Sequence, residues 1–334
     1  MRWVSLLERV ETATEALHFA LGDAQFLKDI INASFDAEAH VIVYLFFFIP
    51  FLPAQMPKIV LITGASSGIG EAAAKFFAAN GFTTYVTARK TASLATLLPL
   101  GCRPLALDVT DEASMQACIA TILAETGTID VLVNNAGYGQ NGVVEELPMD
   151  ALRKQFETNV FGLLRMCQLV LPTMRANHSG RIINIGSAGG DFTAPGASAY
   201  HATKYALEAF TDGLRAEVRA FGVEVSLVKP GGVWTEFTTA MNDTYPAPMP
   251  DSPYLAFREG FKKMTDTMFA RDSRAGILTP EQVAAAIYRA ATAPHPHTRY
   301  RVGIFAKVAP RIFGMIPDRL RDTMFLSSIV PKSK

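Results

Sequence analysis

Cysteine is scarce in this chain of 334 residues. The three cysteines, Cys102, Cys118 and Cys167, are scattered without paired spacing, and no C-x-x-C motif is present. This odd set indicates reduced thiols in an intracellular, cytoplasmic protein and argues against a disulfide framework. The six histidines follow no metal-ligand pattern either, so we expect no metal site.

Net charge is also absent. The chain carries 31 basic and 31 acidic residues, which gives a formal net charge of zero. A balanced chain has no electrostatic basis for binding nucleic acid, so we expect no such partner. Hydrophobic residues make up 49% of the sequence, which is enough for a substantial core in one large domain or two small ones.

The apolar run Val41–Leu52 is too short to cross a bilayer. It holds 12 residues, whereas a spanning helix needs about 20. Asp36 and Glu38 precede it and no basic segment does, which excludes a usual secretory signal. Upstream, residues 3–21 repeat apolar residues at helical spacing and predict an amphipathic helix. A membrane-surface anchor and an extra packing segment stay open, but we interpret residues 1–55 as an extension outside the catalytic domain.

From Lys58 onward, short apolar runs alternate with helical patterns. This rhythm predicts βαβ units and therefore an α/β fold with a Rossmann-like, doubly wound parallel sheet. No linker divides the remaining chain, so we expect one catalytic domain over residues 56–334. The expected strands are Ile59–Ile62, Phe82–Thr87, Leu105–Leu107, Ile129–Val133, Arg181–Ile185, Val223–Lys229 and Arg299–Gly303. The expected helices are Glu71–Asn80, Asp111–Thr126, Met149–Arg175, Ser198–Phe221 and one that begins near Thr279.

A glycine-rich turn joins the first expected strand to the first expected helix. In that position the first glycine permits a tight turn, and the last lets helix and strand pack closely. The free backbone N–H groups at the helix start then accept a pyrophosphate, and the serine hydroxyls add donors. The alternative is a tight turn without a ligand. We expect dinucleotide contacts from Gly64, Ser66, Ser67, Gly68, Ile69 and Gly70.

The end of the second strand discriminates between cofactors. An enzyme that prefers NAD usually places an acid there for the ribose diol, but this chain has Thr87-Ala88-Arg89-Lys90. Two cations without an acid suit a 2′-phosphate, because arginine offers a charge-assisted fork. We therefore expect NADP(H) to be the cofactor, with a solvated charge pair as the alternative. Asp108, followed by Val109 at the end of the third strand, is placed to accept from the adenine amino group.

Tyr200 and Lys204 stand four residues apart in a predicted helix, with Ser187 upstream at a strand end. This spacing puts the phenol and the ammonium on one helix face. The cation favours the phenolate, so we expect it to lower the pKa of Tyr200 and to make a proton-transfer pair. Accidental spacing is the alternative, because Tyr-x-x-x-Lys is common by chance.

Taken together, these motifs resemble those of the short-chain dehydrogenase/reductase family over about residues 57–305. They occur in the family's order and spacing, each at a strand end or in a helix. The matching segments are Thr63-Gly64-x-x-x-Gly68-Ile69-Gly70, Asn134-Asn135-Ala136-Gly137, Asn159 within Thr158-Asn159-Val160-Phe161-Gly162, the set Ser187, Tyr200 and Lys204, and Pro230-Gly231 with Val233 and Thr235.

The resemblance implies a role for each matching residue. Tyr200 would exchange a proton with the substrate oxygen, and Ser187 would hydrogen-bond the substrate carbonyl. Lys204 would hold the nicotinamide ribose, and Asn159 would support a water beside it. Asn135, Ala136 and Gly137, with Pro230, Gly231, Val233 and Thr235, would border the cofactor. We also expect a homodimer or homotetramer.

Residues 236–279 show few regular signals and hold many aromatics and methionines. By their place in the family pattern they would form a helical lid over the substrate, and such side chains make an adaptable apolar lining. The alternative for each is plain packing. The apolar residues are Phe237, Met241, Tyr245, Met249, Tyr254, Phe257, Phe261, Met264, Met268 and Phe269. We therefore expect a small hydrophobic carbonyl or alcohol as substrate.

Two classes of function remain. The first is an NADP(H)-dependent oxidoreductase that interconverts a hydrophobic ketone or aldehyde and its alcohol. The second is a non-catalytic dinucleotide-binding or scaffold protein, since a fold does not fix a function. The intact set Asn159, Ser187, Tyr200 and Lys204 favours the enzyme. A membrane-associated reductase of lipid or steroid ketones is a variant of the first class, in which Val41–Leu52 supplies weak membrane attachment.

Overall fold

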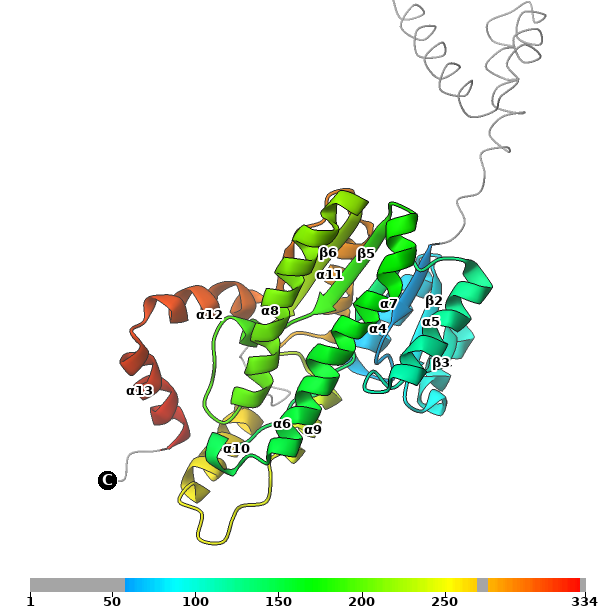
Figure 1. Cartoon of the computed structure of the whole chain (residues 1–334). Helices are drawn as coiled ribbons and strands as arrows, with labels where there is room; N and C mark the ends of the chain where they lie inside the picture. Colours follow the sequence, from blue (N-terminus) through cyan, green and yellow to red (C-terminus); the bar gives the residue numbers. More distant parts are fainter. Residues whose placement is uncertain (1–57, 269–275, 331–334) are drawn as a thin grey trace, which may run out of the picture. The chain divides into compact units, whose positions relative to one another are not determined.

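The computed structural model describes residues 58–268 and 276–330. Within them, parallel strands form one sheet in the order β3-β2-β1-β4-β5-β6-β7, with helices on both faces (Figure 1). The doubly wound α/β prediction is therefore confirmed. The strands are β1 Ile59–Ile62, β2 Thr83–Ala88, β3 Arg103–Ala106, β4 Val131–Asn134, β5 Gly180–Ile185, β6 Val223–Pro230 and β7 Arg299–Val302.

The helices connect these strands and cover the sheet. On one face, α4 (Gly68–Ala79) and α11 (Pro280–Thr292) bury Phe77 and Ile287. The helices α5 (Glu112–Thr126), α7 (Gly162–Ala176) and α8 (Ser198–Val218) supply the core of the other face. All four residues of β1 are buried, as expected for a central parallel strand covered on both sides. The edge strand β3 begins two residues earlier than the predicted Leu105–Leu107.

The single helix expected over Met149–Arg175 is interrupted. It consists of α6 (Met149–Phe156), a π-helical turn over Glu157–Phe161, and α7. Gly162 follows the turn, and a Cβ added there would lie 2.2 Å from the Val109 carbonyl oxygen. The close approach of this helix to the end of the third strand therefore requires glycine at position 162. Single π turns of this kind occur often at functional sites.

The last described elements were not predicted. They are α12 (Ile304–Met315) and α13 (Asp318–Ile329), which follow β7. Phe313 and Phe325 join the two helices with ring centroids 5.4 Å apart. Ile329 is buried against Phe261 of α10 (Leu255–Met268). Together with α9 (Glu236–Asp243), α10 makes the predicted lid segment helical, although Phe269 lies outside the described residues.

Two further predictions concern the start of the chain and membranes. The amphipathic helix and the apolar run Val41–Leu52, both within residues 1–55, lie outside the described residues. Their interpretation as an extension stays a prediction. Among the helices that the structure does describe, none combines the length and the apolar character needed to cross a membrane.

Candidate active site

The carboxyl ends of β1 and β4 are tied together beside the glycine-rich turn. The Thr63 hydroxyl oxygen accepts from the backbone N–H groups of Asn135 at 3.0 Å and Ala136 at 2.9 Å. In return, the Asn135 amide donates to the carbonyl oxygens of Thr63 at 3.0 Å and Gly64 at 2.8 Å. Asn135 therefore fixes the shape of the turn through these hydrogen bonds. This role is more specific than the predicted one, which was only to lie next to the cofactor.

The glycine-rich turn has the shape that a dinucleotide requires. Gly64 and Gly68 have φ values of 66° and 59°, which favour glycine. A Cβ at Gly70 would lie 2.4 Å from the Gly64 carbonyl oxygen and 2.5 Å from Asn135 Nδ2. Ser67 caps the first turn of α4 with its backbone alone, so the first N–H groups of that helix face the turn. These features fit a pyrophosphate at the start of α4.

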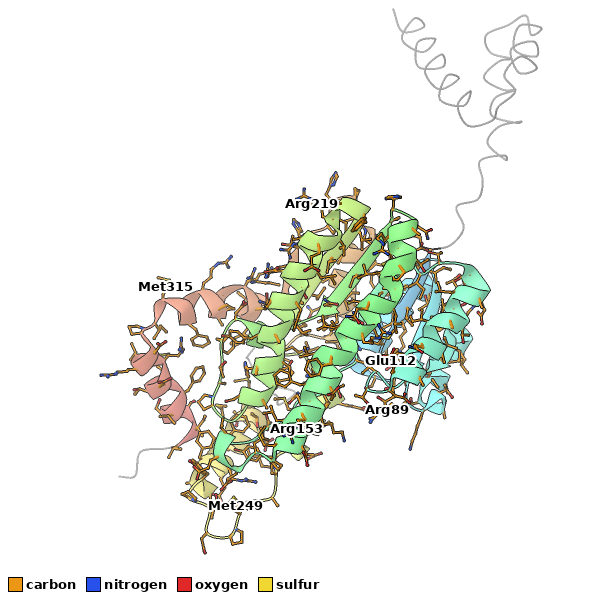
Figure 2. All side chains as sticks on the ribbon, in the orientation of Figure 1. Arg89, Glu112, Arg153, Arg219, Met249 and Met315 are labelled. Atoms are coloured by element: carbon orange, nitrogen blue, oxygen red, sulfur yellow. The ribbon has the colours of Figure 1, made fainter. Side chains whose placement is uncertain are left out.

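Arg89 directly follows β2, and Asp108 lies shortly after β3; both are next to this turn. Figure 2 shows Arg89 at the end of the sheet where the strands finish. Burial alone would raise the pKa of the Asp108 carboxyl, but hydrogen bonds from Thr110 and the charges of Arg89 and Lys154 hold that pKa below its usual value. Asp108 Oδ1 accepts from the Thr110 N–H at 2.9 Å and hydroxyl at 2.7 Å. The exposed Arg89 remains available for an anionic group.

The structure brings Ser187, Tyr200 and Lys204 together, Ser187 just after β5 and the other two in the first turns of α8. A hydrogen bond links Ser187 with Tyr200. The Ser187 oxygen also accepts from the Gly189 N–H at 3.0 Å. Lys204 is buried, and its Nζ donates to the Ile185 carbonyl oxygen at 2.8 Å while lying 5.6 Å from the centre of the Tyr200 ring. A phenol, a hydroxyl and an ammonium therefore meet at one strand end.

The electrostatics of this group correct one expectation. Burial of the Tyr200 hydroxyl raises its pKa to about 12, although the hydrogen bond with Ser187 acts in the opposite direction. The prediction that Lys204 lowers this pKa is wrong for this structure, because the ammonium is directed to the Ile185 carbonyl. Burial lowers the pKa of Lys204 itself to about 8. The phenol is consequently held in its neutral, proton-donating form at neutral pH.

Asn159 lies in the π turn and faces the same site. Its amide oxygen accepts from the Tyr138 N–H at 3.1 Å, and its amide nitrogen donates to the Tyr138 carbonyl at 2.8 Å. The same nitrogen also donates to the Thr203 hydroxyl at 3.2 Å. Since Thr203 directly precedes Lys204, Asn159 joins the segment after β4 to the catalytic helix. Its predicted support of a water stays a prediction.

The segment after β6 returns to the glycine-rich turn. The Gly231 N–H donates to the Val302 carbonyl at 3.0 Å, and Val233 forms a bridge with Leu278. A Cβ at Gly68 would lie 3.1 Å from the Thr235 side chain. The predicted residues Pro230, Gly231, Val233 and Thr235 therefore lie on a path from the sheet to the start of α4.

The lid segment contributes both packing and one contact to the site. The Phe237 ring lies 5.8 Å from the Tyr200 ring, centroid to centroid. Buried polar contacts tie α9 down, since Asn141 donates to the Met241 carbonyl at 3.1 Å and to the Thr244 hydroxyl at 3.0 Å. Phe261 is buried and packs in a hydrophobic cluster, so it serves the packing that was the alternative to a substrate lining. The same holds for the residues around it, namely Met241, Tyr245, Phe257 and Met264. Met249 is exposed.

Comparisons with known proteins decide the family. The family model described as short chain dehydrogenase matches residues 58–246. The chain belongs to the short-chain dehydrogenases. Among curated relatives of this short-chain dehydrogenase is a 3-ketodihydrosphingosine reductase of Bacteroides thetaiotaomicron, 35% identical over 270 residues that cover 81% of this chain and 96% of the relative. As a family member, the protein is an oxidoreductase that acts on CH–OH and carbonyl groups.

Solved structures agree with this assignment. A short-chain dehydrogenase from Streptomyces avermitilis is 35% identical, with a TM-score of 0.67 over 81% of this chain and 96% of that one. A serine dehydrogenase in a closed form with NADP⁺ is 30% identical, with a TM-score of 0.63 over 73% of this chain and 94% of that one. This short-chain dehydrogenase therefore shares its fold with a protein that binds NADP⁺.

One residue of this short-chain dehydrogenase that the sequence did not single out, His201, lies beside Tyr200 and contacts the turn after Ser187. His201 is buried, and its Nδ1 lies 2.9 Å from the Gly189 carbonyl oxygen and 2.7 Å from that of Phe192. It therefore holds the turn that follows Ser187. Burial lowers the pKa of this imidazole, although the two carbonyls oppose the effect. The sequence signal that could have indicated this role is a histidine in the same helix as Tyr200 and directly after it.

Proposed function

We propose that this short-chain dehydrogenase is an NADP(H)-dependent reductase of hydrophobic ketones or aldehydes, with Tyr200 as general acid. The observation that carries the proposal is the meeting of Ser187, Tyr200 and Lys204 at the end of β5, beside a turn that fits a dinucleotide. When bound, the nicotinamide supplies the hydride. The residues of the chain orient the substrate and move the proton.

The proton comes from the phenol. A substrate carbonyl placed near Ser187 and Tyr200 would accept hydrogen bonds from both hydroxyls. Because the pKa of Tyr200 is raised to about 12, the phenol is protonated at neutral pH and can neutralise the developing alkoxide. The reverse reaction needs a phenolate, so the isolated protein is better prepared for reduction than for oxidation. Lys204, whose ammonium donates to the Ile185 carbonyl, would hold the nicotinamide ribose when the cofactor is bound.

The apolar side of the site supports the substrate class. Phe237 lies against Tyr200 and gives the site an apolar wall. The related 3-ketodihydrosphingosine reductase, by its name, acts on a long-chain ketone. We propose a ketone or aldehyde with an extended apolar group. A homodimer or homotetramer and a cytoplasmic location stay predictions.

The test of the function is a panel of carbonyl compounds reduced with NADPH. The panel contains methyl ketones of increasing chain length, each paired with a keto acid of equal length. We expect kcat/KM to rise with chain length and to be low for the acids. If no carbonyl compound in the panel is reduced and no matching alcohol is oxidised, the chain is not the proposed enzyme.

The cofactor preference is tested at Arg89. Arg89→Ala should weaken NADPH binding by about ten- to hundredfold, because a hydrogen bond to a charged group is worth about 1.5–3 kcal/mol. NADH binding should stay nearly unchanged, since NADH lacks the 2′-phosphate. Fluorescence titration with both cofactors measures the effect, with Lys75→Ala as a charge-matched control on the exposed face of α4. Equal weakening of both cofactors would give Arg89 a structural role and remove this basis for NADP preference.

A further inference from the structure

Lys229 is a fully buried cation next to the catalytic residues. Its side chain has 0% exposure and lies between two carboxylates, with Nζ 2.6 Å from Asp191 Oδ1 and in an ion pair with Glu208. Burying a charge is costly unless it is paired, and removal of one partner leaves an uncompensated charge. A side chain placed at such cost must hold its partners firmly.

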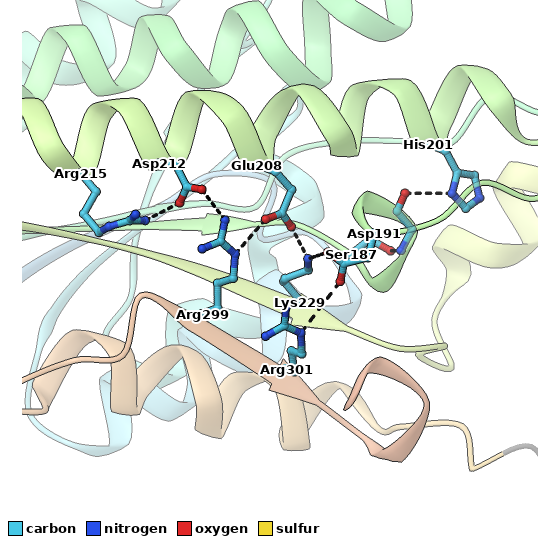
Figure 3. A network of polar contacts seen from close by, with 10 residues as sticks. Ser187, Asp191, His201, Glu208, Asp212, Arg215, Lys229, Arg299 and Arg301 are labelled. Atoms are coloured by element: carbon cyan, nitrogen blue, oxygen red, sulfur yellow. Dashed lines mark hydrogen bonds and ion pairs between the residues drawn. The ribbon is translucent and has the colours of Figure 1, made fainter. Parts of the chain in front are cut away.

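These contacts join the three segments that build the site. Asp191 ends the short turn that begins at Ser187. Glu208 stands on α8, one helical turn beyond Lys204 and two beyond Tyr200. Lys229 itself directly precedes Pro230 at the end of β6. One ammonium therefore connects the serine turn, the tyrosine helix and the segment that leads to the cofactor turn (Figure 3).

Further charges extend this contact into a row of alternating sign. The ionic row runs through Arg301, Asp191, Lys229, Glu208, Arg299, Asp212 and Arg215, as Figure 3 shows. Arg299 lies 2.9 Å from Glu208 and 2.6 Å from Asp212. Arg301 lies farther from Asp191, at 3.9 Å. Arg299 and Arg301 of β7 thus add contacts to the carboxylates, while Lys229 alone of these cations contacts both Asp191 and Glu208.

The turn after Ser187 has no room to shift toward α8. A Cβ added at Gly190 would lie 2.9 Å from the Lys204 carbonyl oxygen and 3.2 Å from Glu208 Oε1. His201 holds the same turn through the carbonyls of Gly189 and Phe192. The turn is consequently clamped on α8 by an imidazole near Tyr200 and by Lys229 near Glu208. The position of Ser187 relative to Tyr200 depends on these contacts between the turn and α8.

We propose that Lys229 is a positioning residue for the reduction, which fixes Ser187 against Tyr200 by neutralising Asp191 and Glu208. The inference rests on the proposed function of Ser187 and Tyr200. Without the ammonium, two carboxylates with little access to water repel each other across the junction of turn and helix. The turn then lifts from α8, and the Ser187 hydroxyl leaves the place where it meets the substrate oxygen. Misplacement of a reacting group by about 1 Å can cost up to about 10² in rate.

The test is steady-state kinetics of Lys229→Met with NADPH and the best carbonyl substrate. We expect kcat to fall by about ten- to hundredfold, with the NADPH dissociation constant and KM nearly unchanged. Lys229→Arg should recover most of the loss, because the charge returns. Adding Asp191→Asn to Lys229→Met should also recover activity, because it removes the repulsion between the carboxylates while Glu208 keeps Arg299 as a partner. Arg215→Met removes a cation at the outer end of the ionic row and should leave kcat nearly unchanged.

The outcomes separate positioning from stability and from the function itself. Unchanged kcat in Lys229→Met, or an equal loss in Arg215→Met at a temperature where both are folded, would overturn the proposal. If Lys229→Met does not fold, the double variant Lys229→Met with Asp191→Asn decides: a folded double variant without restored kcat overturns the proposal. If the wild-type chain reduces no substrate, hydrogen exchange of residues 187–192 with NADPH present is the readout. Faster exchange in Lys229→Met than in Arg215→Met supports the clamp, and equal exchange refutes it.

Discussion

Tyr200→Phe is expected to lower kcat by at least about 10²-fold, the usual cost of losing a general acid. The change removes one hydroxyl and keeps the ring that packs against Phe237. NADPH affinity should be largely kept, since the glycine-rich turn and Arg89 are untouched. Lys204 does not replace the lost donor, because its ammonium is directed to the Ile185 carbonyl.

The measurement is kcat with the best carbonyl substrate, beside an NADPH titration of the same variant. Tyr205→Phe is the matched control, because Tyr205 is a second tyrosine on α8 and its side chain is exposed. That control should turn over at the wild-type rate. Near-normal turnover in Tyr200→Phe would remove the phenol from the mechanism, whatever the behaviour of Ser187.

Lys204→Met should abolish most activity and yet leave the protein without cofactor at least as stable as the wild type at pH 7. Burial lowers the pKa of Lys204 to about 8, against an ordinary value of 10.5. At pH 7 the folded protein therefore contains a buried ammonium that is better solvated in the unfolded chain. Methionine has a similar length, fills the same space and carries no charge. Under the proposed function, the lysine would serve catalysis at a cost in stability.

The pH dependence of this effect has a defined sign. Between about pH 8 and pH 10.5 the unfolded lysine binds a proton that the folded one has released. Stability of the wild type should therefore rise with pH across this window relative to Lys204→Met. Melting temperatures of both proteins at pH 7 and pH 9.5, without cofactor, measure the difference. Lys75→Met, at an exposed ion pair with Glu71, should show no such trend. A difference in melting temperature that stays constant with pH would contradict the burial of a titrating Lys204.

The strands, the sheet type and the main site residues could be predicted because their signals are local. A buried strand such as Ile59–Ile62 is a continuous apolar run, and a glycine-rich turn follows it directly in the sequence. Tyr200 and Lys204 share a helix, so their spacing alone brings them together. Parallel topology then carries Ser187 to the same edge of the sheet. Each of these steps needs only neighbours in sequence or the common direction of the strands.

The π turn at Asn159 and the contacts of Lys229 could not be predicted in the same way. A helical pattern over Met149–Arg175 contains no sign of one extra residue, because the π turn depends on the approach of Gly162 to Val109. The sequence predicted Lys229 only as the last residue of a strand. Its partners Asp191 and Glu208 lie in two other segments, so no local pattern shows the contact. The expected effect of Lys204 on Tyr200 was wrong because spacing gives proximity, whereas the direction of the ammonium depends on the Ile185 carbonyl.

The pairing of Asp191 with Lys229 has an evolutionary consequence. The two residues lie on different segments, and the ion pair between them is screened from water by the turn and the sheet. A reversal of sign at one position alone would place like charges together, so such a change should be selected against. A reversal at both positions does not restore the contacts, because an acid at 229 would lie against Glu208. Loss of charge at both positions removes the repulsion, so related enzymes with a neutral residue at 229 should also have a neutral residue at 191, while Ser187 and Tyr200 stay the same.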